Sequence, residues 1–554
     1  MTRFFLALVA FLTPLTALAQ GTVSSAHPKA SEAGQSMLRA GGSATDASMA
    51  MMLALTVVEP QSSGIGGGGF LLHHNARNGR IETIDGRETA PMAARPDRFL
   101  GPDGKPLGFM QAVPGGRSVG VPGNIRLMAL AHKKWGRLPW KALFQPAIRL
   151  AEDGFAVSKP MAAGMSQVSR IWSNFPATTA LYAPGGKPLA EGAIVRNPKL
   201  AALLRTIADQ GADAFYTGDN ARVLLDTVRG STLAPSDMTA ADLSGYRAKE
   251  RAAVCTTYRK WKLCGMGPPS SGATTVFQIL GMVERFDMKT LGKDSPVAWH
   301  LISEAMLLAY ADREKYLADA DFVAVPVKGL LDRNYIRRRS ALLSMSKSLG
   351  TYEAGTPPGA PRRTRAVQRE VAGTTHFVAV DAQGSVATYT STIEGPFGSQ
   401  LNANGYMLNN ELTDFTRAPE KDGMLVANRP EGGKRPLSSM SPTIVYDAKG
   451  QPVFTVGAAG GKTIIMQVAK ALIAHLDWGL SAREALGEGL IYFNDQGLVL
   501  EQGTAREGLK APLESLGHTV SIGRLGLKAN AAERTAQGWV GAADPRSIGE
   551  ALPQ

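Results

Sequence analysis

The stretch VAGTTHFVAVDAQG, residues 371–384, joins a basic, proline-rich segment to a strand-like apolar run. The three residues that end it, Ala-Gln-Gly, form a plausible hairpin loop, because glycine at the last position of a three-residue loop tolerates the positive φ that this turn needs. The run SVATYTST then forms the second strand. In this register Asp381 faces Ser385, and Thr374 faces Thr392.

A facing pair of threonines in a hairpin is most often packing with an incidental hydroxyl contact. Three features favour chemistry here: Thr374 follows a glycine, begins the strand, and ends the proline-rich segment. Cleavage of the Gly373–Thr374 bond would give this threonine a free α-amine, which can act as the base for its own hydroxyl nucleophile. The ordinary pKa of an α-amine, about 7.7 to 8.0, suits proton transfer at neutral pH. The sequence therefore predicts Thr374 as an N-terminal nucleophile.

The composition predicts a folded protein with a large core. The chain has 554 residues, of which 44% are hydrophobic, enough for two to four domain-sized units. Its formal net charge is +13, but no sustained basic helix with interleaved aromatic residues accompanies this charge. We interpret the charge as a solvated surface or an attraction towards small anionic substrates, and we predict no nucleic-acid partner.

The first residues predict export. Residues 1–19 combine a basic start at Arg3, a short apolar run, and Ala-Leu-Ala before Gln20, the pattern of a cleavable secretory signal. No later segment is apolar over the length of a membrane span. We expect a periplasmic or secreted protein with no membrane span after signal removal.

The two cysteines, Cys255 and Cys264, are too few for a disulfide-rich framework or a thiolate metal cluster. In AVCTTYRKWKLCG, a two-residue turn at 259–260 would place them directly opposite each other, at a separation that suits a disulfide. Arg-Lys is a poor sequence for a tight turn. The two cysteines could therefore form a disulfide or pack as two small hydrophobic side chains, and the sequence does not decide between these alternatives. The histidines show no metal-binding spacing, and we predict no metal and no cofactor.

The order of patterns along the chain predicts helices layered over sheets rather than alternating βαβ units. Residues 43–58 should form a buried helix that begins with a capping box at Ser43 and Asp46. Helical patterns dominate from about 125 to 345, and strand-like runs follow the hairpin. Between them, residues from about 347 to 373 are rich in Gly, Pro and Arg and lack an apolar period, so this segment should be mobile.

A glycine loop, TVGAAGGKTII at residues 455–465, ends like a phosphate-binding loop but has Val456 where that motif requires its first glycine. Nucleotide binding is therefore not predicted. A glycine loop that enters a helix can still present N–H groups to an oxyanion.

Together these motifs resemble the γ-glutamyltranspeptidase (glutathione hydrolase) family of the N-terminal-nucleophile hydrolase superfamily. The resemblance covers nearly all of the mature sequence and runs through ASEAGQSMLRAGGSATDA, PQSSGIGGGGF, DGRETAP, SVGVPG, PPSSG, GTTHF, NNELTDF, RPLSSMSPTI, GAAGGKTI and DPRS. It implies an αββα sandwich formed jointly by a large chain, residues 20–373, and a small catalytic chain, residues 374–554. Family members cut themselves before the catalytic threonine, so the mature protein would be a heterodimer of its own two fragments.

The resemblance also implies the catalytic residues. Thr374 would be the nucleophile and Thr392 its hydroxyl partner, in agreement with the hairpin register. Gly373 and Thr374 would flank the cleavage site, and the segment from about 347 would be the tail released by the cut. Gly460 and Gly461 would supply the oxyanion N–H groups.

For substrate binding, the resemblance implies a γ-glutamyl pocket. Arg87 in DGRE would bind the α-carboxylate, a role suited to a guanidinium fork, with help from Ser438 and Ser439. Glu411 and Asp414 in NNELTDF would hold the α-ammonium.

The implied reaction is cleavage of γ-glutamyl amides such as glutathione through a γ-glutamyl-threonine ester, with water or an amino acid or peptide as acceptor. Two departures bear on specificity. Glu394 stands where the family usually has asparagine, beside the proposed ammonium site, and the segment 416–433 is shorter than the common active-site lid and lacks its tyrosine. A glutaryl-type cephalosporin acylase and a catalytically silent binding paralogue are the alternatives.

Overall fold

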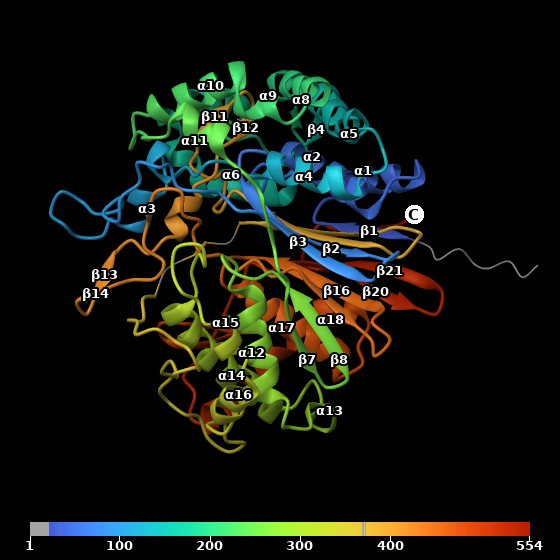
Figure 1. Cartoon of the computed structure of the whole chain (residues 1–554), viewed down its shortest axis with the longest axis vertical. Helices are drawn as coiled ribbons and strands as arrows, with labels where there is room; N and C mark the ends of the chain where they lie inside the picture. The colour runs from blue at the N-terminus through green and yellow to red at the C-terminus, as the bar shows by residue number, and fades with distance from the viewer. Residues whose placement is uncertain (1–20, 368–369, 372) are drawn as a thin grey trace, which may run out of the picture.

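The computed structural model describes residues 21–367, 370–371 and 373–554. Two β-sheets lie face to face in the middle of the molecule, and a layer of helices covers the outer face of each (Figure 1). This is the αββα sandwich that the sequence predicts. The proposed secretory signal, residues 1–19, lies outside the described residues. Among the described residues, no helix is both long and apolar enough to cross a membrane.

The first sheet has seven strands in the order β22-β1-β9-β10-β2-β3-β6. Its strands are β1 (Thr22–Ser25), β2 (Gly68–Asn75), β3 (Arg80–Gly86), β6 (Lys249–Arg251), β9 (Thr375–Val380), β10 (Val386–Thr392) and β22 (Glu550–Pro553). The two strands of the proposed catalytic hairpin therefore lie in the centre of the sheet, with strands from before residue 374 on both sides.

The second sheet has six strands in the order β21-β20-β16-β15-β8-β7. They are β7 (Val254–Tyr258), β8 (Trp261–Gly265), β15 (Thr443–Tyr446), β16 (Pro452–Ala459), β20 (Lys528–Thr535) and β21 (Gly538–Ala543). Short two- and three-stranded sheets lie outside the sandwich: β4 (Phe155–Ala156) with β5 (Ile194–Val195), β11 (Asn402–Ala403) with β12 (Tyr406–Met407), β13 (Glu420–Lys421) with β14 (Met424–Leu425), and β17 (Ile491–Asn494) with β18 (Gly497–Glu501) and β19 (Val520–Gly523).

The helices divide between the two outer faces (Figure 1). Over the first sheet lie α1 (Pro28–Arg39), α2 (Ala44–Val58), α4 (Asn124–Trp135), α5 (Trp140–Asp153), α8 (Pro198–Gln210) and α10 (Gly218–Arg229); under the second lie α12 (Gly272–Val283), α14 (Pro296–Tyr316), α16 (Arg333–Ser340), α17 (Thr463–Leu476) and α18 (Ala482–Gly487). The remaining helices are short: α3 (Phe109–Ala112), α6 (Lys159–Val168), α7 (Pro176–Tyr182), α9 (Asp213–Tyr216), α11 (Ala240–Gly245), α13 (Met288–Leu291), α15 (Val327–Leu330) and α19 (Lys510–Ser515).

The alternation of side chains along β9 shows how the layers are joined. Phe377 and Ala379 are buried in the core under the first helical layer. Val378 and Val380 are buried in the core that the two sheets share with the second helical layer. Because both faces of the strand are covered, its sequence is apolar at successive positions rather than at every second one.

The hairpin has the register that the sequence predicts. Thr375 pairs with Ser391 and Val380 with Val386, and Gly384 takes the positive φ of 85° at the end of the three-residue loop. This register carries Thr374 and Thr392 to the same end of the sheet.

Helix α2 confirms the capping box. The Ser43 side chain accepts from the backbone N–H of Asp46, the Asp46 side chain accepts from the N–H of Ser43, and every residue of the helix is buried. A helix that is apolar on all faces needs cover on all faces, and α1, α5 and the first sheet provide it.

The hairpin β7–β8 settles the cysteine alternatives. Cys255 pairs with Cys264 across the strands, and the two form a disulfide with Cα atoms 4.1 Å apart. The turn at Arg259–Lys260 exists despite its sequence, with Arg259 at a φ of 56°. The Arg259 side chain compensates, because its guanidinium donates to the carboxylate of Asp477 at 3.0 Å and to the carbonyl of Phe286 at 2.9 Å.

Residues 347–367, for which the composition predicts mobility, make polar contacts with helix α14 in the intact chain, and their mobility stays a prediction. The amide of Leu349 donates to Glu304 at 2.9 Å, and the amide of Gly355 donates to Asp312 at 2.8 Å. Arg365 forms an ion pair of 2.9 Å with Glu314. Helix α14 carries these acceptors, so polar contacts rather than an apolar period hold the segment. Its release after cleavage stays a prediction.

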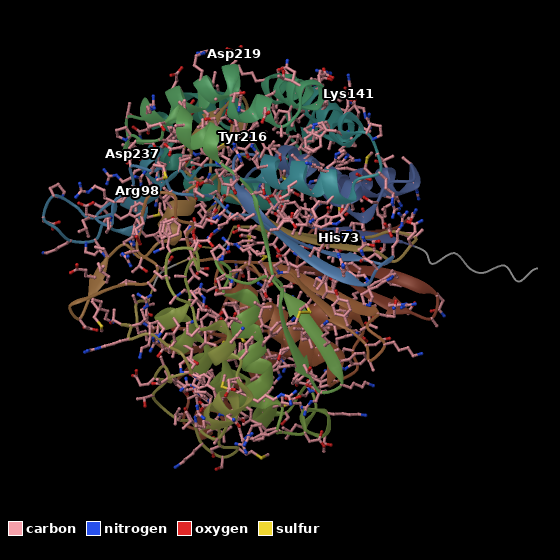
Figure 2. The ribbon with its side chains drawn as sticks, in the orientation of Figure 1. His73, Arg98, Lys141, Tyr216, Asp219 and Asp237 are labelled. Carbon is pink, nitrogen blue, oxygen red and sulfur yellow. A yellow bond between two sulfur atoms is a disulfide. The ribbon has the colours of Figure 1, made fainter. Side chains whose placement is uncertain are left out.

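A ring stack and an ion pair are two of the side-chain contacts in the upper helical layer, and Figure 2 labels His73, Arg98 and Asp237 from them. The imidazole of His73 on β2 stacks on the ring of Trp135 in α4, with centroids 4.2 Å apart. Burial lowers the pKa of His73 to about 3, so it is neutral at physiological pH. Arg98 forms an ion pair of 2.9 Å with Asp237 at the edge of the layer.

Candidate active site

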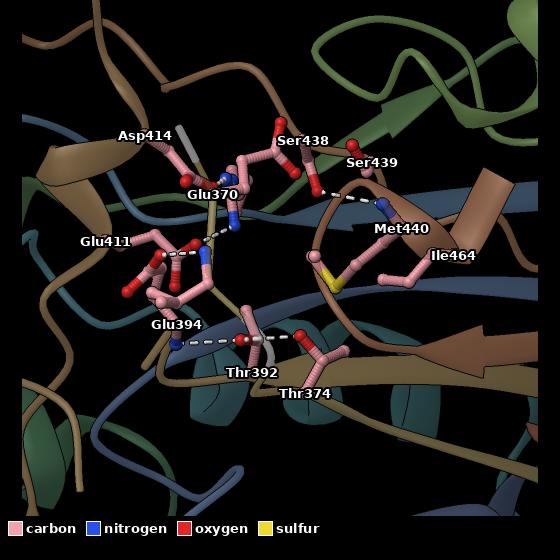
Figure 3. Close-up of a pocket in the computed structure, with 13 residues that line it drawn as sticks. Glu370, Thr374, Thr392, Glu394, Glu411, Asp414, Ser438, Ser439, Met440 and Ile464 are labelled. Atoms are coloured by element: carbon pink, nitrogen blue, oxygen red, sulfur yellow. Dashed lines mark hydrogen bonds and ion pairs between the residues drawn. The ribbon is translucent and has the colours of Figure 1, made fainter. Parts of the chain in front are cut away.

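A pocket opens at the end of the first sheet where Thr374 and Thr392 lie (Figure 3). It collects residues from both sides of the proposed cleavage site. Its lining residues are Arg87, Glu370, Val371, Thr374, Thr392, Glu394, Glu411, Asp414, Ser438, Ser439, Met440, Gly461 and Ile464. Every catalytic and substrate-binding residue that the sequence suggests is in this set except Gly460.

The hydroxyl groups of Thr374 and Thr392 are in direct contact. Thr374 Oγ1 donates to Thr392 Oγ1 at 3.1 Å, and Thr392 Oγ1 also accepts from the backbone N–H of Glu394 at 2.7 Å (Figure 3). Both threonines are buried. Because the Thr374 proton points at another oxygen, the lone pairs of Thr374 Oγ1 are free for attack on a carbonyl.

The backbone at the proposed cleavage site is strained. Thr374 has a φ of 79°, a conformation that is a true outlier for a β-branched residue. Its N–H donates to the carbonyl of Ser62 at 3.1 Å. Gly373 is forced to be glycine, because a Cβ there would lie 1.6 Å from the carbonyl oxygen of Glu394. The neighbouring structure thus fixes the strained peptide in place.

A partly buried ion pair lies next to the start of this strand. Lys528 Nζ contacts the carboxylate of Glu59, and the same carboxylate accepts from the hydroxyl of Thr375. Lys528 Nζ also reaches the Ser62 hydroxyl at 3.4 Å. Ser62, which binds the Thr374 amide, is therefore positioned by a network that connects the first sheet to β20.

Arg87 lies deep in the pocket with 1% of its surface exposed. Its guanidinium pairs with Glu411 and, at 2.6 Å, with Asp414. It also donates to the carbonyl oxygens of Pro436 at 3.2 Å and Leu437 at 2.9 Å. In the intact chain, the proposed carboxylate clamp thus binds the two acidic residues proposed for the ammonium.

The acidic side of the pocket holds three carboxyl groups together: Glu394, Glu411 and Asp414. Burial is the main cause that raises the pKa of each well above its ordinary value, and neighbouring carboxylates add to it: Asp414 for Glu394, and Glu370 for Asp414. Glu394 accepts from the amide of Val371 at 3.3 Å and from the Asn410 side chain.

Two of these carboxyl groups have unused acceptors. Glu411 Oε2 and Asp414 Oδ1 are buried without a hydrogen-bond partner among the described residues. Glu88, directly beside them, has its pKa raised to about 7, also mainly by burial. The carboxyl groups therefore hold protons more strongly than usual, and a cation that enters the pocket would favour their ionisation, with loss of the protons to solvent.

The two serines lie on the opposite side, on the segment that follows Arg435. Ser439 Oγ accepts from the guanidinium of Arg313 at 2.8 Å, and Ser438 Oγ accepts from the amide of Met440 at 3.2 Å. Arg313 forms an ion pair with Glu370, four residues before Thr374. A residue of the proposed tail therefore reaches into the proposed substrate pocket.

Gly460 and Gly461 lie between β16 and α17, with φ values of 130° and 59°. Gly461 lines the pocket, and a Cβ there would lie 2.7 Å from the carbonyl oxygen of Val371. Gly460 lies outside the lining and faces a neighbouring hollow together with Gly373. The loop therefore reaches the pocket that Thr374, the proposed nucleophile, also lines.

Sequence reasoning missed three residues of the site: Glu370, Arg313 and Asn410. Glu370 follows a basic, proline-rich segment that contains no motif, so nothing in the sequence indicates a role for it. Arg313 lies in the charged run 312–315 at the end of the helix 296–316, and such a run looks like an ordinary solvated helix end. The sequence alone therefore contains no signal for its buried position.

Outside the pocket, the described residues include one group that could hold a metal ion: His300, Glu304 and His518. His300 Nδ1 lies 2.7 Å from His518 Nε2. Both oxygens of Glu304 already accept hydrogen bonds from the segment 348–352. We assign this cluster a structural role, and the absence of a metal stays a prediction.

The stacked sheets between helical layers, with the facing threonines at the head of the central hairpin, define a hydrolase fold of the N-terminal-nucleophile type. The family model described as gamma-glutamyltranspeptidase matches residues 30–554. This protein belongs to the γ-glutamyltranspeptidase family.

Individual relatives agree with this assignment. The chain is 37% identical over 507 residues to the glutathione hydrolase proenzyme of Bacillus subtilis, covering 90% of this chain and 85% of that protein. It is 34% identical over 509 residues to the acylase ACY 1 proenzyme of Pseudomonas sp. strain SE83, covering 90% and 87%. The crystal structure of cephalosporin acylase from Bacillus halodurans has the same fold, with a TM-score of 0.84, 24% identity and coverage of 99% of both chains.

Proposed function

We propose that this protein is a self-processing γ-glutamyl hydrolase and transpeptidase that cleaves γ-glutamyl amides such as glutathione. The observation that carries the proposal is the contact between Thr374 and Thr392 at the head of a central hairpin, inside a pocket that holds both guanidinium and carboxyl groups. Family membership and a glutathione hydrolase proenzyme at 37% identity support it.

Self-processing begins with Thr374 as the nucleophile. Its hydroxyl oxygen attacks the carbonyl carbon of Gly373 while its proton passes to Thr392, which in turn gives a proton to the peptide nitrogen. The nitrogen leaves as an amine, and an ester forms between Gly373 and the Thr374 side chain. Water hydrolyses the ester, which leaves a carboxylate on Gly373 and a free amine on Thr374. The strained φ of Thr374 disappears with the peptide bond, so cleavage is favoured by the release of strain.

Turnover uses the new amine as the base. It takes the proton of the Thr374 hydroxyl, whose oxygen attacks the γ-carbonyl of the donor, and then passes this proton to the donor's nitrogen, which leaves as an amine and a γ-glutamyl ester remains. Water or the amine of an amino acid or peptide then attacks the ester. The N–H groups of the Gly460–Gly461 loop stabilise the oxyanion that forms in each step.

The two sides of the pocket suit the two charges of a γ-glutamyl group. The carboxyl cluster of Glu394, Glu411 and Asp414 receives the α-ammonium, and its unused acceptor atoms provide hydrogen-bonding capacity. Arg87, Ser438 and Ser439 form the side that receives the α-carboxylate.

A glutaryl-type acylase is the second candidate, because the acylase ACY 1 proenzyme is similar over 90% of this chain. A glutaryl group lacks the ammonium, so it would leave Glu394 and the unused acceptor atoms of Glu411 and Asp414 buried beside it with no cation other than Arg87. For this reason we rank it second. A silent binding paralogue is the third, and it would remain a single uncut chain.

We further propose that the protein is exported, as residues 1–19 suggest. The disulfide between Cys255 and Cys264 supports this proposal, because disulfides persist mainly in oxidising compartments outside the cytosol. Fractionation of cells followed by detection of the protein would test it; retention in the reducing cytosol would contradict it.

Replacement of Thr374 tests the function directly. Thr374→Ala should remain one uncut chain and release no p-nitroaniline from γ-glutamyl p-nitroanilide, because both the processing and the catalytic nucleophile are lost. Thr374→Ser should still be processed, more slowly. Thr388→Ala, which removes another buried hydroxyl from the same hairpin, is the control and should be processed normally. Two-chain processing of Thr374→Ala on a denaturing gel would remove this residue from the mechanism.

A further inference from the structure

The side chain of Glu370 occupies part of the substrate pocket in the intact chain. Its carboxylate is buried, with 3% of its surface exposed, and is paired with Arg313. The hydroxyl of Ser439 also binds it, and Figure 3 shows Glu370 between Asp414 and the two serines. Although burial opposes its ionisation, Arg313 and Lys462 hold the pKa of Glu370 below its ordinary value. A carboxylate therefore already sits at the serine side of the pocket.

Arg313 is held rigidly for this contact. Its Nε donates to Ser271 Oγ at 2.8 Å and its Nη2 donates to Ser439 Oγ at 2.8 Å. The side chain has 1% of its surface exposed. Its Nη1 is buried without a hydrogen-bond partner among the described residues. The guanidinium thus has a fixed orientation and an unused donor.

Cleavage affects the two guanidinium groups of the pocket differently. The partners of Arg87 are Glu411, Asp414 and two backbone carbonyls, all of which belong to the small chain after the cut. The carboxylate partner of Arg313 belongs to the tail that ends at Gly373. When the tail leaves, Arg313 loses the Glu370 carboxylate, whereas Arg87 keeps its ion pairs with Glu411 and Asp414. An unpaired buried guanidinium is costly, so the vacated place favours a new carboxylate.

We propose that Arg313 and Ser439 form the subsite that binds the α-carboxylate of the donor, beside Arg87, and that Glu370 fills this subsite until self-cleavage releases the tail. The inference rests on the proposed function. In the uncut chain the Glu370 carboxylate mimics the substrate and blocks the binding of donors. After cleavage, the α-carboxylate of the donor replaces it.

Two donors that differ by one group test the role of Arg313. γ-Glutamyl p-nitroanilide carries the α-carboxylate, whereas 4-aminobutanoyl p-nitroanilide keeps the ammonium and lacks the carboxylate. Arg313→Lys keeps a charge but loses the two-armed guanidinium. We expect it to reduce the ratio of kcat/KM for the γ-glutamyl donor to kcat/KM for the 4-aminobutanoyl donor by at least about tenfold. Arg506→Lys changes another buried guanidinium far from the pocket and should leave the ratio within about twofold of wild type. An unchanged ratio in Arg313→Lys would overturn the assignment.

A binding experiment on uncut chains tests the role of Glu370 and does not require activity. Thr374→Ala blocks cleavage, and glutarate serves as the carboxylate probe in calorimetric titrations. We expect Thr374→Ala combined with Glu370→Ala to bind glutarate at least about tenfold more tightly than Thr374→Ala alone. Thr374→Ala combined with Glu353→Ala, which removes an exposed acidic residue of the same segment, should behave like Thr374→Ala. Equal affinities in all three chains would show that Glu370 does not fill the subsite.

The outcomes separate this inference from the proposed function. If processed wild-type enzyme hydrolyses neither donor, the proposed function fails, while the titration still reports on Glu370. If the wild-type enzyme prefers the γ-glutamyl donor and Arg313→Lys keeps that preference, the function stands and the inference fails.

Discussion

The backbone of Gly373 passes so close to Glu394 that a Cβ at position 373 would lie 1.6 Å from the Glu394 carbonyl oxygen. Glu394 is also the residue whose N–H binds the Thr392 hydroxyl at 2.7 Å. One residue therefore positions both the scissile peptide and the hydroxyl partner of the nucleophile, and Gly373 is the counterpart that makes this approach sterically possible.

Gly373→Ala should slow self-cleavage by at least about tenfold, because the scissile peptide must move away from Glu394 to make room for the methyl group. A time course of the uncut and cut bands on a denaturing gel measures the rate. Gly508→Ala is the control, since a Cβ at Gly508 has no neighbour within 4 Å. Processing of Gly373→Ala at the wild-type rate would contradict the steric role of this glycine.

Arg87→Lys should lower kcat/KM for γ-glutamyl p-nitroanilide by at least about tenfold while self-cleavage continues. Lysine keeps the charge but cannot contact Glu411 and Asp414 through two arms, so the carboxyl groups lose their fixed arrangement. Steady-state kinetics on the processed variant measure the effect.

Arg98→Lys is the matched control for Arg87→Lys, because Arg98 is an arginine of low exposure that pairs with Asp237 at the surface of the upper layer. It should leave kcat/KM within about twofold of wild type. If Arg87→Ala is processed and fully active, Arg87 has only a structural role.

The wild-type enzyme should prefer γ-glutamyl over glutaryl p-nitroanilide by at least about tenfold in kcat/KM, or about 1.4 kcal/mol. The two donors differ only in the ammonium, and without it Glu394 and the unused acceptor atoms of Glu411 and Asp414 stay buried with no cation other than Arg87. Glu394→Asn should reduce the ratio of the γ-glutamyl to the glutaryl kcat/KM, and the preference that remains would be due to Glu411 and Asp414. Equal or faster turnover of the glutaryl donor by the wild-type enzyme would favour the acylase function.

The same preference should increase with pH. The pKa values of Glu394, Glu411 and Asp414 are raised, so these groups carry protons at low pH and lose them as pH rises. An ammonium binds the ionised cluster, whereas a glutaryl group, which brings only a negative charge, is best tolerated by the protonated cluster. We expect the γ-glutamyl to glutaryl ratio of kcat/KM to rise as the pH increases above the ordinary pKa range of carboxyl side chains, about 4. A ratio that is flat or falls as the pH increases would falsify the proposed ammonium site.

The central hairpin could be predicted from sequence because its information is local. The glycine of the loop fixes the register, and the register alone brings Thr374 opposite Thr392. The capping box at Ser43 and Asp46 is local in the same sense. The order of strands in the two sheets does not depend on local sequence. Strand β22 pairs with β1, almost the whole chain away, and no short pattern encodes such a pairing.

The site was predicted unevenly for a similar reason. Motifs located Arg87, Glu411 and Asp414, but not that the arginine binds the two acids in the intact chain. The contact between Glu370 and Arg313 joins a segment that lacks an apolar pattern to a buried helix. Composition could not indicate this contact, because composition reports on apolar burial and not on ion pairs with a distant helix.

Strands from both fragments alternate in the first sheet: β1 lies between β9 and β22, and β10 lies beside β2. Neither fragment contains a complete sheet, so neither has a core to fold around before the other is present. The proposed cut must therefore follow folding, and each large chain would be made together with its own small chain. Under this proposal the cell obtains the two subunits in a strict one-to-one ratio without any control of their separate synthesis.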